Sequence, residues 1–515
     1  METRKLIRWY GSGLALLAIV LLGAALRLYR IGAQSFWLDE AVSVVHAAQP
    51  AGELLRQLAT TDIDPPLYGL LLHFWLHLGD SEATIRLLSA LCSLATIPVL
   101  YLLGRRIGSP RLGLLAALIL AVSPFHVQYA QEARMYALLT LSATLSIYFL
   151  VCLLTDPRAA ADPIGAGLAG WRRRRGVATD LSWLGYVLFT AATPLVHVTA
   201  LVLPLAINLF VLGGWLAVRA GPRRLAFLFT DRQSPGTWAG SARFLRNWLM
   251  AQGGVLLLLA AWVPLQLGGY ARVSAAFWLP APTPLTVLSA WWQMSSAFAP
   301  KQWPFLLAIP VLFPALAALG ALSWRARPQW PLLWAVLIGS LFGAELVASL
   351  RHPVFLARTL IWASIPYYLL IAAGLLHLRR PGWAMAGLAA LLLINGTSLY
   401  AYYTGYQKEP WREVAAYIAG QADAGDVILV SPPYLRTPLD FYLARHALPT
   451  PEEEISTQTI AQLPALIAGH DRVWLAYGHD SVADRRHRVP AALGQQLHLA
   501  RERPFGELRV FEYVR

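Results

Sequence analysis

Two short acidic motifs and a few isolated basic residues are the parts of this sequence best suited to chemistry. Asp39 and Glu40 follow the aromatic pair Phe36 and Trp37, shortly after the first long apolar run. Carboxylates beside aromatic side chains suit sugar binding or general base catalysis. We therefore take Asp39 and Glu40 as candidate catalytic residues.

The stretch 30–82 that contains this pair is unusually long for a segment between apolar runs, and it is both acidic and aromatic. Its periodicity predicts amphipathic helices near 41–59 and 67–78, a kind of helix that can lie in a membrane interface. Carboxylates in a wet loop are often simply solvated, and we expect that of three further acidic side chains here. They are Glu53, Asp80 and Glu82.

A second constellation is HVQYAQEARMYALL at 126–139, in a tight turn between two apolar runs. Glu132 and Arg134 must lie close to the membrane surface, where ionisable groups are usually paired or functional. The alternative is an internal Glu132–Arg134 pair with an orienting role.

Three basic residues stand out in otherwise apolar surroundings. His197 follows the run TAATPLV, and a buried structural histidine is an equally good interpretation. Arg358 is expected at the start of an apolar helix without an adjacent acid, which suits forked phosphate binding or snorkelling to headgroups. Arg272, in GGYARVSAAFW, is a weaker phosphate candidate.

The composition indicates what must position these residues. Hydrophobic residues make up 57% of the 515 and charged residues 14%, whereas soluble domains carry roughly a quarter charged residues. With a mean hydropathy of +0.50, the chain is too apolar for a soluble enzyme or a disordered protein. Cys92 and Cys152 lie in apolar runs and are expected to be small buried side chains rather than a disulfide.

About eleven segments are long and apolar enough to be membrane-spanning helices, which need about 20 residues each. The first is interpreted as a retained helix rather than a signal peptide because its apolar run is too long. The expected spans are 11–29, 83–103, 112–126, 135–154, 181–196, 198–218, 246–268, 304–323, 330–350, 355–376 and 383–403.

The basic residues predict the orientation of these spans. With the N-terminus in the cytoplasm, about 21 Lys and Arg residues fall inside and about seven outside, as the positive-inside rule requires. The net charge of +14 then marks the cytoplasmic ends of the spans. The run WRRRR at 171–175 is interpreted as a topology anchor, and nucleic acid is not an expected partner.

The chain beyond 404 changes character. Strand-like runs at GDVILV, DRVWLAYG and ELRVFEYV alternate with helical patterns at WREVAAYIAGQA, TPLDFYLARH, TQTIAQLPALIAG and VPAALGQQLHLA. This alternation predicts a small α/β domain over 404–515, placed outside by the orientation above, after a membrane domain over 1–403.

Three motifs resemble those of the GT-C class of integral membrane glycosyltransferases. They are FWLDEA at 36–41, DPPLYGLLLHFW at 64–75 and SPFHVQYAQEARMYALL at 123–139. The sequence is similar to protein O-mannosyltransferases (glycosyltransferase family 39) and to the lipid A aminoarabinose transferase, most clearly over residues 1–200. The resemblance implies an α-helical polytopic GT-C fold in the plasma membrane, with a C-terminal extracytoplasmic domain.

The resemblance also implies a reaction. A polyprenyl-phosphate-linked sugar would be the donor, and a lipid, glycan or protein hydroxyl at the outer face would be the acceptor. Asp39 maps onto the general base of an inverting displacement, with the neighbouring Glu40 left as an alternative. Arg358, then Arg134 and Arg272, would stabilise the departing phosphate. The implied substrate-binding residues are Asp64, Tyr68, Glu132, Tyr136 and His197.

Some relatives need a divalent cation such as Mg²⁺ or Mn²⁺, for which Glu132 and Asp39 would be candidate ligands. Two rival functions remain. A transporter or flippase of lipid-linked sugars would place charges deep within helices, and Glu345 is the main example here. A structural membrane protein would need none of the candidate residues.

Overall fold

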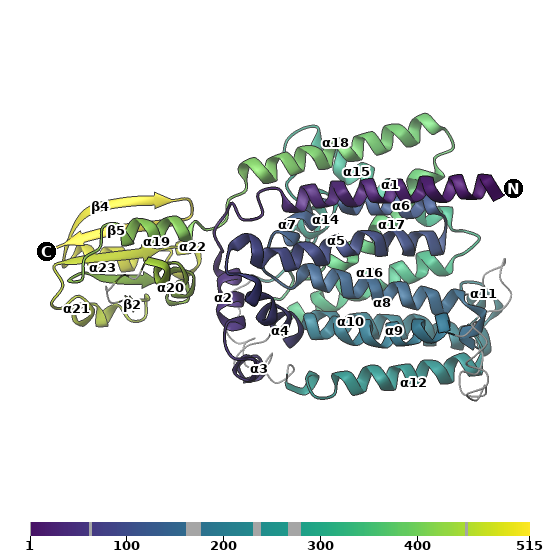
Figure 1. Cartoon of the computed structure of the whole chain (residues 1–515), viewed down its shortest axis with the longest axis horizontal. Helices are drawn as coiled ribbons and strands as arrows, with labels where there is room; N and C mark the ends of the chain where they lie inside the picture. The colour runs from purple at the N-terminus through teal and green to yellow at the C-terminus, as the bar shows by residue number, and fades with distance from the viewer. Residues whose placement is uncertain are drawn as a thin grey trace. The chain divides into compact units, whose positions relative to one another are not determined.

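A computed structural model of the chain describes residues 2–60, 64–160, 177–229, 238–265, 280–446, 448 and 452–515. These residues form two compact units (Figure 1). Unit 1 comprises residues 1–29, 55–70 and 87–404, and unit 2 comprises residues 30–54, 71–86 and 405–515. The chain therefore enters unit 2 three times, and the predicted division into 1–403 and 404–515 stays a prediction.

Unit 1 is built from helices, most of them long and apolar. The main ones are α1 (Glu2–Leu28), α5 (Glu82–Ile107), α6 (Pro110–Ala121), α7 (Pro124–Ala130), α8 (Tyr136–Thr155), α9 (Val177–Val196), α10 (Val202–Arg219), α12 (Ala242–Leu259), α14 (Pro284–Ser296), α15 (Phe305–Ser323), α16 (Gln329–Ser349), α17 (Ser364–His377) and α18 (Pro381–Gly405). Shorter helical turns are η2 (Pro157–Ala160), η3 (Val198–Leu201), α11 (Arg223–Ala226) and η5 (Ile361–Ala363).

Every one of the eleven expected spans contains a helix. Among the described residues, seven helices are long and apolar enough to cross a membrane, and α6 with α7 makes an eighth if that pair is one span bent by 61°. Three other predicted spans, in α9, α12 and α17, are not among these, and two of them fall short for visible reasons. Arg243 and Arg246 lower the hydropathy of α12, and α17 begins only at Ser364 rather than near 355. Helix α14 was not predicted.

The bend between α6 and α7 follows from the sequence. Ser123 caps α7 and Pro124 occupies its first turn, so the preceding helix must end. The freed carbonyl oxygens of Leu120 and Ala121 accept hydrogen bonds from the buried guanidinium of Arg27, at 3.2 and 2.9 Å. An irregular backbone is tolerated there because its polar groups have partners.

Helices α15 and α17 approach each other closely. A Cβ atom added to Gly320 would overlap the carbonyl oxygen of Leu370, and one added to Gly374 would overlap that of Leu316. Small residues at facing positions allow this backbone contact, which is a common way of packing membrane helices.

Unit 2 contains a five-stranded sheet in the order β2-β1-β3-β5-β4. Its strands are β1 (Val427–Ser431), β2 (Glu452–Glu454), β3 (Arg472–Tyr477), β4 (His498–Phe505) and β5 (Leu508–Val514). Its helices are α2 (Leu38–Ala47), α19 (Trp411–Ala419), α20 (Arg436–Leu443), α21 (Leu463–Leu466), α22 (Asp480–Ala483) and α23 (Arg488–Gly494), with the short turns η6 (Pro433–Leu435), η7 (Ala444–His446) and η8 (Ile460–Gln462). Helices α3 (Ala51–Thr60) and α4 (Pro66–Trp75) with turn η1 (Leu76–Leu78) complete the stretch 30–82.

The sheet is mixed. Strand β1 pairs in parallel with β2 and β3, whereas β3 with β5, and β5 with β4, are antiparallel. Leu429, Leu475 and Phe511 come into register across β1, β3 and β5 and belong to one buried apolar cluster. The predicted small α/β domain is therefore confirmed.

The strands at both edges of the sheet were not predicted. The expected helix over 489–500 is wrong at its end, because α23 stops at Gly494 and β4 starts at His498. Strand β4 carries exposed charged side chains and lacks an apolar face, which is typical of an edge strand.

Candidate functional site

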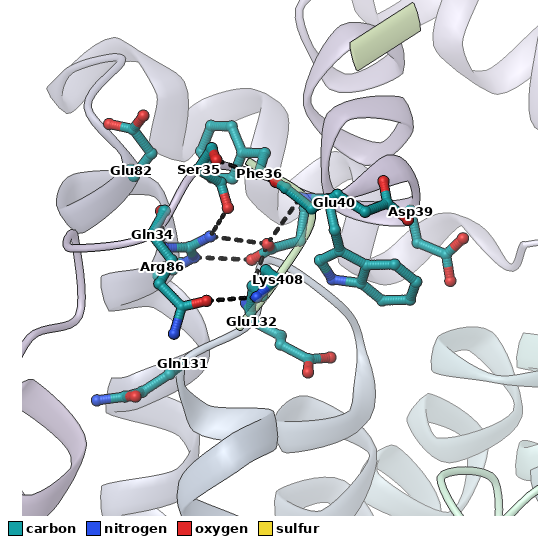
Figure 2. Close-up of polar contacts among 12 residues, drawn as sticks. Gln34, Ser35, Phe36, Asp39, Glu40, Glu82, Arg86, Gln131, Glu132 and Lys408 are labelled. Carbon is teal, nitrogen blue, oxygen red and sulfur yellow. Dashed lines mark hydrogen bonds and ion pairs between the residues drawn. The ribbon is translucent and has the colours of Figure 1, made fainter. Parts of the chain in front are cut away.

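The first turn of α2 carries the acidic pair. Trp37 has an extended backbone at the N-cap position, and Asp39 and Glu40 follow within the first turn. Consecutive helical residues point about 100° apart, so the carboxylates of Asp39 and Glu40 face different surroundings. Figure 2 shows Glu40 directed at two cationic side chains while Asp39 points away from them.

Glu40 forms a buried ion cluster with Arg86 and Lys408. Its Oε1 accepts from Arg86 Nε at 2.8 Å, and its Oε2 accepts from Arg86 Nη2 at 2.8 Å and from Lys408 Nζ at 3.0 Å (Figure 2). Glu40 is 0% exposed and Arg86 1%. A forked arginine–carboxylate pair is strong and geometrically specific, so this cluster fixes the Glu40 side chain.

Arg86 also organises the backbone that leads into α2. Its guanidinium donates to the carbonyl oxygens of Ile31, Gln34 and Ser35 at 2.8 to 2.9 Å. It lies 5.1 Å from the ring centroid of Phe36, the first residue of the acidic motif. Phe36 therefore contributes packing at this point, and Arg86 connects it to Glu40.

Asp39 is partly exposed, and its charge acts on His479, the residue that precedes α22. The pKa of His479 lies above its ordinary value, mainly because His479 bonds to Glu409, with further contributions from the charges of Glu409, Glu507 and Asp39. His479 Nε2 and Glu409 Oε1 are 2.9 Å apart. Asp39 thus belongs to a polar region that includes residues from the C-terminal part of the chain.

In unit 1, Asp64 and Tyr68 connect to the second motif. Arg134 Nη2 lies 3.4 Å from Asp64 Oδ2. The hydroxyl groups of Tyr68 and Ser89 are 3.1 Å apart, and that of Ser89 donates to the carbonyl oxygen of Arg134 at 3.1 Å. The structure therefore brings together Asp64, Tyr68 and Arg134.

Glu132 and Arg134 lie in the turn between α7 and α8, as the sequence predicted, and both are buried. Glu132 Oε1 accepts from Gln128 Nε2 at 3.2 Å. The side chain of Gln131 donates to the carbonyl oxygens of Arg27 and Tyr29 at 2.9 and 2.7 Å. Gln131 therefore ties this turn to the end of α1.

Tyr136, His197 and Arg358 form a third group in unit 1. The ring centroids of Tyr136 and His197 are 6.0 Å apart, and the Arg358 guanidinium lies 5.7 Å from the Tyr136 centroid. His197 lies at the break between α9 and η3, where its ring accepts from the amide of Thr199. Loss of hydration, aided by the charges of Arg134 and Arg358, lowers the pKa of His197. The charges of both arginines therefore act on His197.

Arg358 lies in the turn before η5 and not within a helix, which corrects the expected span start at 355. Thr359, its neighbour, donates to Glu345 Oε2 at 2.8 Å. Glu345 is 2% exposed, on α16. This buried carboxylate therefore anchors the turn that carries Arg358.

Comparison with known proteins agrees with this architecture. Residues 64–212 match the family described as dolichyl-phosphate-mannose-protein mannosyltransferase, and no curated protein matches the chain. ArnT from Cupriavidus metallidurans in the apo state superposes with a TM-score of 0.62 at 14% identity, over 98% of each chain. The chain therefore has the GT-C fold.

Two further structures share this GT-C fold. ArnT bound to undecaprenyl phosphate has a TM-score of 0.59 at 12% identity, over 96% of this chain and 97% of that one. The oligosaccharyltransferase AglB from Archaeoglobus fulgidus, in complex with an inhibitory peptide and a dolichol-phosphate, has a TM-score of 0.55 at 11% identity. That match covers 94% of this chain and 72% of AglB.

The family match includes one subset of the predicted site residues. Those within 64–212 are Asp64, Tyr68, Glu132, Arg134, Tyr136 and His197. Asp39, Glu40 and Arg358 fall outside it. Arg272 and the run at 171–175 lie outside the residues that the structure describes.

Sequence reasoning missed several residues of the acidic region. Arg86, Lys408, Glu409 and His479 were not singled out, and only their polarity next to apolar runs could have drawn attention to them. Glu53 and Asp80 are exposed as expected. The expectation for Glu82 is wrong, because this side chain is buried and accepts from Tyr442 and Arg412 at 3.0 and 3.3 Å.

The described residues contain no group of three or more His, Cys, Asp or Glu side chains that could hold a metal ion. The donor set for the Mg²⁺ or Mn²⁺ ion implied by the resemblance is therefore incomplete among them.

Proposed function

We propose that this protein transfers a sugar from a polyprenyl-phosphate-linked donor to an acceptor hydroxyl, with inversion at the sugar carbon. The observation that carries the proposal is the Arg358 guanidinium beside the ring of Tyr136, which itself lies beside His197, in a GT-C fold. The charge of Arg134 acts on the same histidine, and guanidinium groups suit a phosphate, which arginine binds in a forked geometry. ArnT with the same fold binds undecaprenyl phosphate, which supports a lipid phosphate here.

In the proposed reaction Asp39 is the general base. It removes the proton of the acceptor hydroxyl, whose oxygen attacks C1 of the sugar from the side opposite the phosphate. The bond between C1 and the phosphate oxygen breaks, and its electron pair leaves with the polyprenyl phosphate. One displacement inverts the configuration at C1. Asp39 is preferred over Glu40 because both oxygens of Glu40 already accept from Arg86 or Lys408.

Arg358 and Arg134 stabilise the negative charge that develops on the departing phosphate, as fixed cations do at other sites of charge development. Asp64 orients Arg134 through their ion pair. Tyr68, Glu132, Tyr136 and His197 contribute to substrate binding. Arg272 remains a predicted third phosphate ligand.

The proposal includes a location. The apolar helices indicate a multi-pass membrane protein. From the distribution of Lys and Arg we propose a plasma membrane protein with a cytoplasmic N-terminus and an extracytoplasmic C-terminal domain. A lipid, glycan or protein acceptor then arrives from outside.

Asp39→Asn tests the function. General base catalysis contributes about 10²- to 10⁴-fold, so transfer from a radiolabelled polyprenyl-phosphate sugar is expected to fall by that factor while undecaprenyl phosphate affinity is unchanged. Glu53→Gln is the matched control, an exposed carboxylate in the same stretch of chain. Full transfer by Asp39→Asn would remove Asp39 from the role of base.

A flippase of lipid-linked sugars is the second candidate, because Glu345 is a buried ionisable group in α16. The hydrogen bond from Thr359 to this carboxylate shows that Glu345 also anchors the turn that carries Arg358. Fluorescent lipid-linked sugar in proteoliposomes separates the two functions. Flipping that depends on Glu345, without any transfer, would favour the flippase.

A further inference from the structure

Two neighbouring residues near the start of the C-terminal part hold the first turn of α2 from both sides of Asp39. Lys408 Nζ donates to Glu40 Oε2 at 3.0 Å. Glu409 Oε2 accepts from the backbone amide of Leu38 at 3.2 Å. The residues directly before and after Asp39 are therefore each bound to the pair Lys408–Glu409, more than 360 positions along the chain.

The bond from Leu38 to Glu409 fills a gap that the local sequence leaves. The first amide groups of a helix have no partner within the helix, and a Ser, Thr, Asp or Asn at the N-cap usually supplies one. Trp37 occupies that position here, and an indole can only donate. The carboxylate of Glu409 serves instead, and its negative charge also suits the N-terminal end of a helix dipole.

Glu409 is itself held firmly. Trp411 Nε1 donates to its Oε2 at 2.6 Å, and His479 Nε2 lies 2.9 Å from its Oε1. His479 Nδ1 lies 3.2 Å from the hydroxyl of Tyr434. His479 lies two residues after the carboxyl end of β3, and the amide of the intervening Gly478 donates to the carbonyl oxygen of Ser431 on β1. The sheet thus fixes the histidine, and the histidine fixes Glu409.

We propose that Lys408, Glu409 and His479 form a clamp that holds the first turn of α2, and with it the orientation of Asp39. These are positioning residues, because they act on the reaction only through Asp39. This inference rests on the role of Asp39 proposed above. Through the clamp, the sheet of the C-terminal part sets the direction in which the base points.

The test uses the full-length protein in lipid nanodiscs with the variants Glu409→Ala, Glu409→Gln and His479→Gln. Glu453→Gln is the matched control, because this exposed carboxylate lies on β2 of the same sheet. Three quantities are measured: amide hydrogen exchange of the peptide 36–47, the kcat and KM of transfer, and the affinity for undecaprenyl phosphate.

Glu409→Ala is expected to speed amide exchange at the start of α2 by about tenfold or more, since a hydrogen bond to a charged group is lost. It is expected to lower kcat by a similar factor with unchanged affinity for undecaprenyl phosphate. Glu409→Gln and His479→Gln, which each retain hydrogen-bonding groups, are expected to recover part of both losses. Glu453→Gln is expected to match the unmodified protein.

Unchanged exchange in Glu409→Ala would overturn the clamp, whatever the activity. The clamp would also be overturned if Glu409→Ala exchanged more slowly than the unmodified protein and its loss of kcat were not smaller in the two Gln variants. Failure of the proposed function gives a different result, because the unmodified protein would then transfer no sugar while Glu409→Ala still exchanged faster. The exchange measurement therefore decides on the clamp independently of the reaction.

Discussion

Glu40→Gln should destabilise unit 2 strongly, because it removes the negative charge with which both Arg86 and Lys408 form buried ion pairs. Three charge-assisted hydrogen bonds end on this carboxylate, at 2.8, 2.8 and 3.0 Å. Breaking a buried ion pair by removing one partner costs about 3 to 5 kcal/mol. Each kcal/mol lowers Tm by about 2 to 4 °C in a unit of this size, so Tm should fall by roughly 6 to 20 °C.

Lys408→Met is the informative partner variant. It leaves the forked Arg86–Glu40 pair intact and removes one charged hydrogen bond, which costs about 1.5 to 3 kcal/mol. The expected order of stability is therefore unmodified protein, then Lys408→Met, then Glu40→Gln. Thermal unfolding of the purified protein, read by intrinsic fluorescence at one detergent concentration, measures the three values of Tm.

Two results would refute this reasoning. One is a Glu40→Gln protein whose Tm lies within about 1 °C of the unmodified value, given the expected loss of several kcal/mol. The other is a greater loss in Lys408→Met than in Glu40→Gln. A stable Glu40→Gln protein that lacks transfer would make Glu40, and not Asp39, the base.

Three further predictions concern other parts of the molecule. Arg358→Ala is expected to weaken undecaprenyl phosphate binding about tenfold or more, and Arg358→Lys to recover only part of it because the fork is lost; titration calorimetry measures both. The hydrogen bond to Glu409 raises the pKa of His479. Protonated His479 therefore stabilises the folded protein fully below the ordinary pKa of 6.5, and this contribution is lost as the pH rises through the folded-state pKa. His479→Gln should remove that part of the pH dependence of Tm. Gly320→Ala should lower Tm through overpacking against a backbone carbonyl of α17, at a cost of about 1 to 3 kcal/mol, whereas Gly339→Ala, which meets nothing within 4 Å, should not.

The length of the apolar runs was sufficient to predict a helical membrane protein and the position of most helices, and the GT-C fold was predicted from the motif resemblance. The acidic pair and the turn around Glu132 were found from local residue types. The structure places the pair in the first turn of α2 and Glu132 in the predicted turn between α7 and α8. The shortfall in spans has a physical origin. A short apolar run such as that around α17 resembles a span until the turn that carries Arg358 is known.

The sequence alone did not predict which residues far apart in the chain pair with one another. Glu40 is 46 residues from Arg86 and 368 from Lys408, and nothing in their local surroundings indicates pairing. Glu82 was predicted to be a solvated carboxylate, because its partners Arg412 and Tyr442 are 330 and 360 residues away in the chain. Strand β4 was missed because nearly all its side chains are exposed, so that no buried face produces an alternating pattern.

The assembly of unit 2 from three separate stretches of chain has a consequence for biosynthesis. Glu40 leaves the ribosome 368 residues ahead of Lys408. At about 5 to 20 residues per second, the acidic turn waits roughly 20 to 70 s for its second cation. The first part of unit 2 must therefore persist half-built while nearly all the helices of unit 1 are being made. A chain that ends before residue 408 would contain the predicted apolar spans, but the first turn of α2 would lack its bonds to Lys408 and Glu409.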